Sequence, residues 1–557
     1  MNISFLGPIG CVTGSCYWLR HHPEGGPALE FLVDCGARQG ERDNDAWNKA
    51  PLPFRASRID FVLLTHAHLD HSGLLPRLAQ EGFRGEVYCT EATRDIAVVT
   101  LSDGAKHEGA SYTMQDVERL RFCTIDAATL GACCHVKGDV FMQAYRTAHI
   151  YGAVSIRVLW GPRQKQRSIT FSGDLGPNES CSSPMALHAA RQVPPPSEYV
   201  LVESTYGNRA RPAEECSDAN RLVWLRDEVQ RAMREDDGVL LIPCFAVDRL
   251  QAVLFDLHRL WWRDRSCLLG AQVVVHSAMA TKVNHIYARH ISASTSPKRA
   301  RDAQLAWCGD ATIRALRRTN GADLDRSEVF SALAGVLDAS RTPSPSLPRL
   351  HRVAGDCDEV LRLSGRKIIL TTAGMCSGGP IQTYLSAYLH HSSATVLLTG
   401  YQSEGTLGRQ LQDLHDLRQR GEVREMRLVL GDKGSIECRS VRAMVGRLRG
   451  YSAHADQTGL VRWLLGDAQT KGAAGGTIFL THGDENARHG LRVALTKRIL
   501  ARGGSQVVET PHHPGEAFDL DAGRWLDDPR AEMHAQLTAL WQRVERLETQ
   551  DRARVCP

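Results

Sequence analysis

The most restrictive feature of this sequence is a short segment in which four side chains able to bind a metal ion fall within six residues. This H-x-H-x-D-H motif consists of His66, His68, Asp70 and His71, and it follows the apolar stretch 61–64, which we expect to be a β-strand. Four such side chains at this spacing cannot share one face of a regular helix or strand. They must turn around a point, and a bound metal is the usual reason for that arrangement.

Three more residues complete a ligand set for two adjacent metal ions. Each lies near the polar end of its own apolar or β-branched run: His149, Asp174 and His482. A lone histidine is usually hydrogen-bonded or exposed, and most of the 23 in this chain must be, so these assignments depend on the motif. Five His and two Asp favour Zn²⁺ or Mn²⁺. Two ions roughly 3.5–4 Å apart suit phosphoester hydrolysis. Asp174 is the natural bridge, because a carboxylate can bind two ions whereas an imidazole normally binds one.

The composition is that of an ordinary globular protein. The chain has 557 residues, 43% of them hydrophobic and 23% charged, which allows two or three domains and a sizeable core. A net charge of +4 is compatible with nucleic acid but does not argue for it. The 16 cysteines include no C-x-x-C pair, so we expect buried thiols in a reducing compartment. No apolar stretch reaches membrane-spanning length, which predicts a soluble, cytoplasmic protein without membrane contact.

The order of the expected elements indicates an α/β protein with an inserted unit. Short strands alternate with helices up to Glu203, and βα alternation over about 216–275 suggests a parallel sheet in a separate domain. The Arg- and Ser-rich segment around 292–350 reads as an irregular insertion. After about 408 we expect strands again, and residues 531–547 have the spacing of an amphipathic helix.

Further motifs follow the same order as those of a known family. Asp34 lies in Leu-Val-Asp-Cys-Gly, and Asp174 in Phe-Ser-Gly-Asp-Leu. Glu203 lies in Glu-Ser-Thr-Tyr-Gly-Asn-Arg, His454 in Tyr-Ser-Ala-His-Ala-Asp, and His482 in Leu-Thr-His-Gly-Asp. With the H-x-H-x-D-H segment and His149, these motifs resemble a metallo-β-lactamase-fold hydrolase, and within that fold the β-CASP nucleases. The resemblance covers roughly residues 1–515.

The resemblance implies a metallo-β-lactamase αββα sandwich with an inserted β-CASP α/β domain. The expected parts are the sandwich over 1–205 and 409–520, the β-CASP domain over 206–408 with its insertion, and a helical tail over 521–557. It also implies roles. One metal would be held by His66, His68 and His149, and the second by Asp70, His71 and His482, with Asp174 bridging. Asp34 would orient a ligand histidine without binding metal.

The resemblance also assigns the chemistry of the reaction. A metal-bridging hydroxide would attack phosphorus, and His454 would be the general acid, with its pKa raised by Glu203. The competing interpretations are a structural glutamate at a domain junction and an exposed histidine in a turn. Catalytic roles are therefore expected for Asp70, Asp174, Glu203 and His454.

Two other segments are candidates for substrate binding. The glycine-flanked Ser377, Gly378 and Gly379 could present backbone N–H groups to an anion, or could be only a tight turn before a helix. Arg249 is a further candidate that could touch substrate or bridge the domains. The chain departs from the family pattern at His276 to Ala280, where relatives often have Asp-Ser-Pro-Met-Ala.

The histidine at 482 favours RNA over DNA as substrate, because DNA-processing relatives typically lack it. We therefore expect a metal-dependent ribonuclease that cuts single-stranded RNA endonucleolytically, leaving 3′-OH and 5′-phosphate ends and using two Zn²⁺, or Mn²⁺. It would resemble the endonuclease subunit of the polyadenylation machinery and its prokaryotic counterparts. The alternatives are a 5′–3′ exoribonuclease, a DNA nuclease of the same fold, a metallohydrolase of thioesters or small phosphodiesters, or an inactive scaffold. The resemblance is also compatible with a homodimer and with a protein partner.

Overall fold

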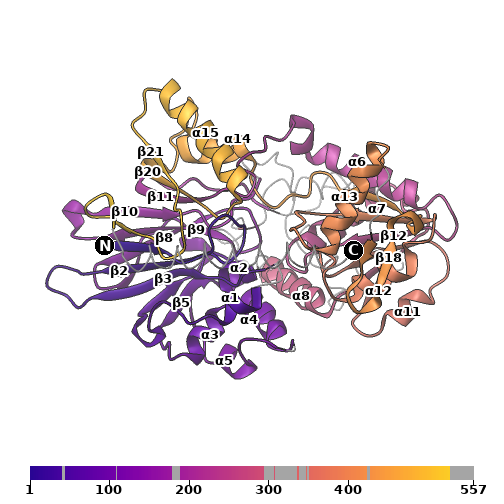
Figure 1. The fold of residues 1–557 in the computed structure, drawn as a ribbon, viewed down its shortest axis with the longest axis horizontal. Coiled ribbons are helices and arrows are strands. Elements are labelled where there is room, and N and C mark those ends of the chain that lie inside the picture. Colours follow the sequence, from indigo (N-terminus) through magenta and orange to yellow (C-terminus); the bar gives the residue numbers. More distant parts are fainter. Residues whose placement is uncertain are drawn as a thin grey trace, which may run out of the picture.

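The computed structural model describes residues 1–39, 44–107, 109–177, 188–293, 350–422 and 427–526, together with the single positions 307, 335, 337 and 347. These residues form two lobes (Figure 1), one built on two facing sheets and the other on a third. Among the described residues, no helix is both long and apolar enough to span a membrane.

The first sheet has the strand order β23-β22-β1-β2-β3-β4-β5-β6. Its central strands β3, β4 and β5 are parallel, and β3 and β4 are almost wholly buried, as expected for strands covered on both faces. The strand bounds are β1 (Asn2–Phe5), β2 (Cys16–His21), β3 (Leu29–Cys35), β4 (Phe61–Leu63), β5 (Glu86–Thr90), β6 (Arg121–Ile125), β22 (Ala517–Asp519) and β23 (Arg524–Leu526).

The second sheet has the order β21-β20-β11-β10-β9-β8-β7. Strands β10, β11 and β20 are parallel neighbours, although the whole second lobe is inserted between β11 and β20 in the sequence. The strand bounds are β7 (Cys134–Lys137), β8 (Val140–Arg146), β9 (Val154–Trp160), β10 (Arg167–Phe171), β11 (Ser197–Glu203), β20 (Ala474–Thr481) and β21 (Val507–Glu509).

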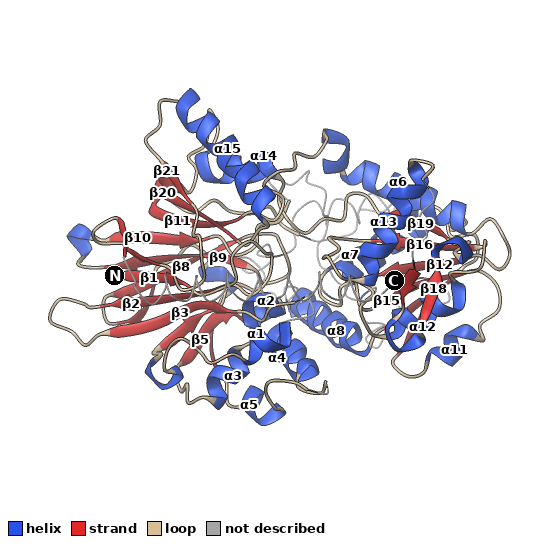
Figure 2. Cartoon of the chain, in the orientation of Figure 1, coloured by secondary structure: helices blue, strands red, loops and turns tan. Residues whose placement is uncertain are grey.

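Helices cover the outer faces of this sheet pair (Figure 2), which confirms the expected αββα sandwich. Leu460, Leu464 and Leu491 pack against Val200 and Ile478 of the second sheet, so burial of apolar surface holds the outer helices in place. The helices of this lobe are α1 (Asn44–Lys49), α2 (Leu69–Ser72), α3 (Leu75–Gln80), α4 (Glu91–Gly104), α5 (Met114–Glu118), α14 (Gln457–Leu465) and α15 (Glu485–Ala501).

The second lobe is a parallel α/β domain with the strand order β14-β13-β15-β12-β16-β19. Its strands are β12 (Val239–Pro243), β13 (Gln272–His276), β14 (Leu350–Val353), β15 (Lys367–Thr371), β16 (Ala394–Leu398) and β19 (Met444–Arg447), and the short pair β17 (Arg427–Val429) and β18 (Ser435–Glu437) lies beside them. Its helices are α6 (Asp218–Ala232), α7 (Arg249–Arg263), α8 (Ala278–Ala293), α11 (Cys357–Leu361), α12 (Pro380–Tyr388) and α13 (Leu407–Gln419).

The expectation of strands directly after residue 408 was wrong, because helix α13 occupies that position. Leu407, Leu411, Leu414 and Leu417 recur at helical spacing and are all buried, and the Thr406 side chain caps the first turn by accepting from the Arg409 N–H. Strand β19 then pairs with β16. We therefore propose that the chain returns to the first lobe after residue 447 rather than at 409.

Two expected segments fall largely beyond the described residues. The irregular insertion around 292–350 is described only at its ends and at four internal positions. The expected helical tail 521–557 begins instead with strand β23, and its amphipathic stretch 531–547 lies outside the described residues.

Candidate metal centre

Three functional candidates converge because their strands are parallel neighbours. Asp174 follows β10, Glu203 is the last residue of β11, and His482 follows β20. Glu203 stands opposite Thr481 in the strand pairing, and the Ser204 N–H donates to the His482 carbonyl. Carboxyl ends of parallel strands meet at one edge of a sheet, and that edge is a usual place for a site.

The facing sheet supplies Asp34 and the histidine-rich segment from its own carboxyl edge, and the second sheet supplies His149. Asp34 lies near the end of β3, and the histidine-rich segment follows the parallel neighbour β4. His68 directly precedes the short helix α2, which carries Asp70 and His71. His149 comes from the connection between β8 and β9.

The Asp174 carboxylate lies at the centre of the cluster and faces a different group of histidines with each oxygen. Its Oδ2 lies 3.6 Å from Nε2 of His66 and 3.4 Å from Nε2 of His149. Its Oδ1 lies 3.3 Å from Nε2 of His71 and 3.5 Å from Nε2 of His482. This is the arrangement expected of a carboxylate that bridges two cations.

The two groups are completed by the remaining motif residues. Nδ1 of His68 lies 3.0 Å from Nε2 of His149, and Oδ2 of Asp70 lies 3.8 Å from Nε2 of His482. Ligand atoms lie within 4.8 Å of one another in each of two sets, which share Asp174: one with His66, His68 and His149, the other with Asp70, His71 and His482. The structure therefore brings all seven predicted ligands together in the predicted grouping.

The cluster has the donor atoms that a pair of metal ions requires. Nε2 of His66, Nε2 of His71 and Oδ1 of Asp174 are buried and have no hydrogen-bond partner among the described residues. An unsatisfied buried polar atom costs roughly 1–3 kcal/mol. Three of them pointing at one place are explained by cations that they would coordinate, so the residues fit a binuclear centre.

The protonation states also fit metal binding. Burial holds the pKa of His66, His68 and His149 below the ordinary value, which keeps these imidazoles neutral, as a ligand must be. Burial also disfavours charge on His71, but the carboxylates of Asp174 and Asp34 outweigh it and raise its pKa. The local potential on that side therefore favours a positive charge.

Three histidines of the centre are each oriented by a contact of the second ring nitrogen, Nδ1. Nδ1 of His71 lies 2.7 Å from Oδ2 of Asp34, whose carboxylate also accepts from the backbone and hydroxyl of Thr65. Nδ1 of His482 lies 2.9 Å from the Ser15 hydroxyl, and Nδ1 of His149 donates to the Ala453 carbonyl at 3.0 Å. Such contacts set the ring orientation and leave Nε2 for the metal. Sequence analysis missed Ser15 and Ala453, because neither the residue type nor the spacing distinguishes them.

His454 and Glu203 form a pair beside the cluster. Nδ1 of His454 lies 3.1 and 3.2 Å from the two carboxylate oxygens of Glu203, which is buried and also accepts from the Leu175 N–H at 2.8 Å. Burial lowers the pKa of His454, but the charge and hydrogen bond of Glu203 outweigh it, so the pKa lies above the ordinary value. His454 is therefore suited to hold a proton near neutral pH.

A cavity of about 220 Å³ opens over the cluster and is lined by both lobes. The first lobe contributes His68, Asp70, His149 and His482, and His454 comes from the segment that returns from the second lobe. The second lobe contributes residues on the opposite wall: Ala246, Val247, Arg249, Met279, Met375 and Tyr401. A substrate that reaches the metal centre must therefore pass between the lobes.

Comparison with known proteins agrees with this architecture. The metallo-beta-lactamase superfamily matches residues 9–120, the Beta-Casp domain matches 250–411, and the Zn-dependent metallo-hydrolase RNA specificity domain matches 439–501. Along the chain, the first match lies in the first lobe and the second in the inserted lobe, and the third spans the return to the first lobe. The chain belongs to the β-CASP ribonuclease family. It is a metal-dependent hydrolase of that family.

Relatives match almost the whole chain. Ribonuclease TTHA0252 of Thermus thermophilus is 29% identical over 520 residues, which cover 90% of this chain and 97% of that protein. Transcription termination factor FttA of Methanosarcina mazei is 26% identical over 507 residues, covering 90% of this chain and 69% of that protein. FttA of Methanococcus maripaludis is 28% identical over 472 residues, covering 83% and 64%.

The candidate substrate residues of this β-CASP protein lie in different surroundings. Arg249 begins α7, is buried, and lines the cavity over the cluster. Its Nη1 has no partner among the described residues, and Nη2 lies 3.8 Å from Oδ2 of Asp248. By contrast, Ser377, Gly378 and Gly379 precede α12 and are not among the residues that line this cavity.

The departure from the β-CASP pattern at His276 has a local structural explanation. Nδ1 of His276 lies 2.5 Å from the Tyr384 hydroxyl, and Nε2 donates to the Gly355 carbonyl at 3.0 Å. Both ring nitrogens are therefore satisfied within the second lobe. The nearby Met279 lines the cavity over the cluster.

Proposed function

We propose that this β-CASP protein hydrolyses phosphodiester bonds of single-stranded RNA endonucleolytically, leaving 3′-OH and 5′-phosphate ends. The observation that supports this most directly is Asp174, whose two oxygens face two groups of ligands below a cavity between the lobes. A binuclear centre of this kind suits phosphoester hydrolysis. The match of residues 439–501 to an RNA specificity domain supports RNA as the polymer.

Two divalent cations, Zn²⁺ or Mn²⁺, would be held by the seven ligands. One would take His66, His68 and His149, the other would take Asp70, His71 and His482, and Asp174 would contact both. When bound, such ions supply an activated water and neutralise the charge that develops on the phosphate. Asp34 would orient His71 through its 2.7 Å contact.

The protein's own groups would manage the leaving oxygen and the substrate charge. With Nδ1 of His454 directed at Glu203, Nε2 is left to donate a proton to the departing O3′. The buried guanidinium of Arg249, whose Nη1 has no partner in the described part of the chain, would bind a phosphate oxygen from the second lobe. Catalytic roles are accordingly proposed for Asp70, Asp174, Glu203 and His454.

The test is cleavage of labelled linear RNA, circular RNA and single-stranded DNA by the metal-loaded protein, with and without a chelator. An endonuclease cuts circular RNA, whereas a 5′–3′ exonuclease cannot begin on it. Product ends are mapped by their acceptance of a 5′-phosphate-dependent ligase and of a 3′-OH-dependent polymerase. Cleavage of linear but not circular RNA would indicate an exonuclease instead of an endonuclease. Hydrolysis of small esters without cleavage of RNA or DNA would rule out a nuclease.

Substitutions of predicted ligands test whether RNA cleavage depends on the metal centre. Asp70→Ala and His482→Ala are expected to abolish cleavage while leaving the thermal unfolding profile cooperative. His22→Ala is the matched control, because His22 is exposed and does not line the cavity. Full activity in Asp70→Ala and His482→Ala would contradict the ligand assignment.

A further inference from the structure

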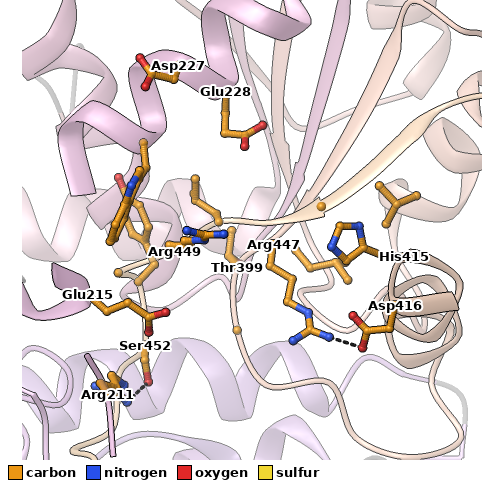
Figure 3. A pocket seen from close by; sticks show the side chains of 18 of the residues that line it. Arg211, Glu215, Asp227, Glu228, Thr399, His415, Asp416, Arg447, Arg449 and Ser452 are labelled. Carbon is orange, nitrogen blue, oxygen red and sulfur yellow. Dashed lines mark hydrogen bonds and ion pairs between the residues drawn. The ribbon is translucent and has the colours of Figure 1, made fainter. Parts of the chain in front are cut away.

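A second and larger cavity, of about 1010 Å³, lies beside the one over the metal centre. Its walls are formed by α6, α13, β19 and the segment 448–452 (Figure 3). The two cavities share four lining residues: Tyr206, Gly400, Tyr451 and Ser452. Its volume reaches the upper end of the roughly 300–1,000 Å³ typical of small-molecule sites. An extended ligand in the first cavity could therefore continue directly into the second.

The charged lining of this second cavity leaves two guanidinium groups free of carboxylate partners. Three acidic side chains are paired with arginines of the lining: Glu215 with Arg209, Glu228 with Arg231, and Asp416 with Arg447. The fourth, Asp227, pairs with Arg226. In the part of the chain that the structure describes, the guanidinium groups of Arg211 and Arg449 form no ion pair with a carboxylate.

Aromatic rings lie beside these two guanidinium groups. The guanidinium carbon of Arg449 lies 5.7 Å from the ring centre of Trp224, on α6. That of Arg211 lies 5.1 Å from the ring centre of Tyr206, and the Tyr206 ring centre lies 6.1 Å from that of His454. Arg211 also donates to the Ser452 hydroxyl and to the His454 carbonyl. Two cation–aromatic pairs therefore line the same cavity, Arg211 with Tyr206 beside the general-acid candidate and Arg449 with Trp224 on α6.

We propose that this second cavity binds the RNA strand on one side of the bond that is cut. Arg449 and Arg211 would contact successive backbone phosphates, and Trp224 and Tyr206 would stack against bases, which is how single strands are held without reading a particular sequence. This inference rests on the proposed ribonuclease function. It adds that affinity for long RNA depends on Arg211, Trp224 and Arg449, which do not line the metal cavity.

The experiment compares Arg449→Glu and Trp224→Ala with the wild-type holoenzyme on three substrates. These are a long single-stranded RNA, an RNA too short to reach the second cavity, and bis(p-nitrophenyl) phosphate, a small diester that tests hydrolysis at the metal centre alone. The matched control is Arg265→Glu. Arg265 also lies over tryptophan rings, 3.6 Å from the centre of Trp261, but lines neither cavity.

For Trp224→Ala we expect KM for the long RNA to rise about tenfold, as loss of one stacked base predicts. For Arg449→Glu we expect a similar rise and a decrease of about one in the slope of log affinity against log salt concentration. Hydrolysis of the short RNA and of bis(p-nitrophenyl) phosphate should stay within about twofold of wild type. Arg265→Glu should match wild type on all three substrates.

The outcomes separate this inference from the function on which it rests. Wild-type KM on long RNA in both variants would overturn the second binding cavity and leave the ribonuclease intact. Equal losses on all three substrates would also overturn it, since the residues would then act on the centre itself. Absence of RNA cleavage by the wild type, with hydrolysis of the small ester, would overturn both. If Arg449→Glu does not unfold cooperatively, Arg449→Gln replaces it with the same expected direction.

Discussion

The Glu203 carboxylate and the His454 imidazole lie 3.1 Å apart although 251 positions separate them in the chain. Glu203 ends a strand of the first lobe, and His454 follows the segment that returns from the second lobe. The pair therefore forms only when the chain, after the inserted lobe, returns to the first lobe beside Glu203. His454 also lines the cavity between the lobes, so the proton donor faces the substrate path.

Replacement of His454 by alanine should lower kcat for RNA cleavage by about 10²–10⁴-fold, the usual contribution of a general acid. The metal content should remain unchanged, because His454 is not one of the seven predicted ligands. The measurement pairs single-turnover kinetics with elemental mass spectrometry. Loss of metal in His454→Ala would show that the residue belongs to the ligand set instead.

Glu203→Gln should shift the pH dependence of cleavage. Burial lowers the pKa of His454 and Glu203 raises it to a net value above the ordinary one, so removing the negative charge lowers that pKa. A general acid works only while protonated, and activity falls as pH rises through its pKa. The alkaline limb of the pH–rate profile should therefore move to lower pH in Glu203→Gln. An unmoved limb, with kcat reduced equally at every pH, would show that Glu203 acts only as a structural residue.

The number of bound metal ions should differ between a variant of the bridging carboxylate and a variant of a single-metal ligand. Asp174→Ala removes the carboxylate that faces both groups and should lose both ions, whereas His149→Ala should lose mainly one. Elemental analysis after desalting gives the number of ions per chain, with His22→Ala as the control. Retention of two ions by Asp174→Ala would rule out the bridging assignment.

Asp34→Ala should weaken metal binding by about 10–100-fold, as the loss of contacts behind a ligand histidine typically does. The cause is the 2.7 Å contact that directs His71. Competition with a chelator of known affinity measures the change. Asp34→Asn can still accept a hydrogen bond from His71, so its metal affinity should lie between those of wild type and Asp34→Ala. If Asp34→Ala bound metal as tightly as wild type, the orientation of His71 would not depend on Asp34.

Asp256→Ala should be among the most destabilising substitutions of the second lobe. Its buried carboxylate accepts from Arg221 at 2.7 Å, Arg259 at 2.9 Å and the Tyr451 hydroxyl at 2.7 Å. Removal leaves two buried cations short of a partner, at a cost of about 3–5 kcal/mol. Urea unfolding measures the change in the free energy of unfolding. The control is Asp358→Ala, because Asp358 is exposed and pairs with Arg362 at the surface; we expect it to lose less than about 1 kcal/mol. Equal effects would contradict the role of the buried network.

His258 should make the folded protein less stable as pH falls from about 6.5 to 4. Burial, and then the charge of Arg265, lower its pKa to about 4. The unfolded chain therefore takes up a proton that the folded chain refuses, and stability decreases as the unfolded His258 becomes charged. The contribution reaches roughly 3 kcal/mol near pH 4. In His258→Gln this part of the pH dependence should disappear; an unchanged profile from urea unfolding across this range would contradict it.

The sequence by itself determined the ligand chemistry and the class of fold. His66, His68, Asp70 and His71 lie so close in the chain that their convergence is a local property. The positions of Asp174, Glu203 and His482 at strand ends can be read without coordinates. Tertiary structure decided the rest. Parallel pairing of β10, β11 and β20 brings the candidates together, but only the folded side chains show which oxygen of Asp174 faces which histidines. Only the folded chain reveals Ser15 and Ala453 behind the ligands. Helix α13 could have been predicted from the helical spacing of its leucines, whereas the arginine-lined cavity could not, because cavities arise between segments that are distant in sequence.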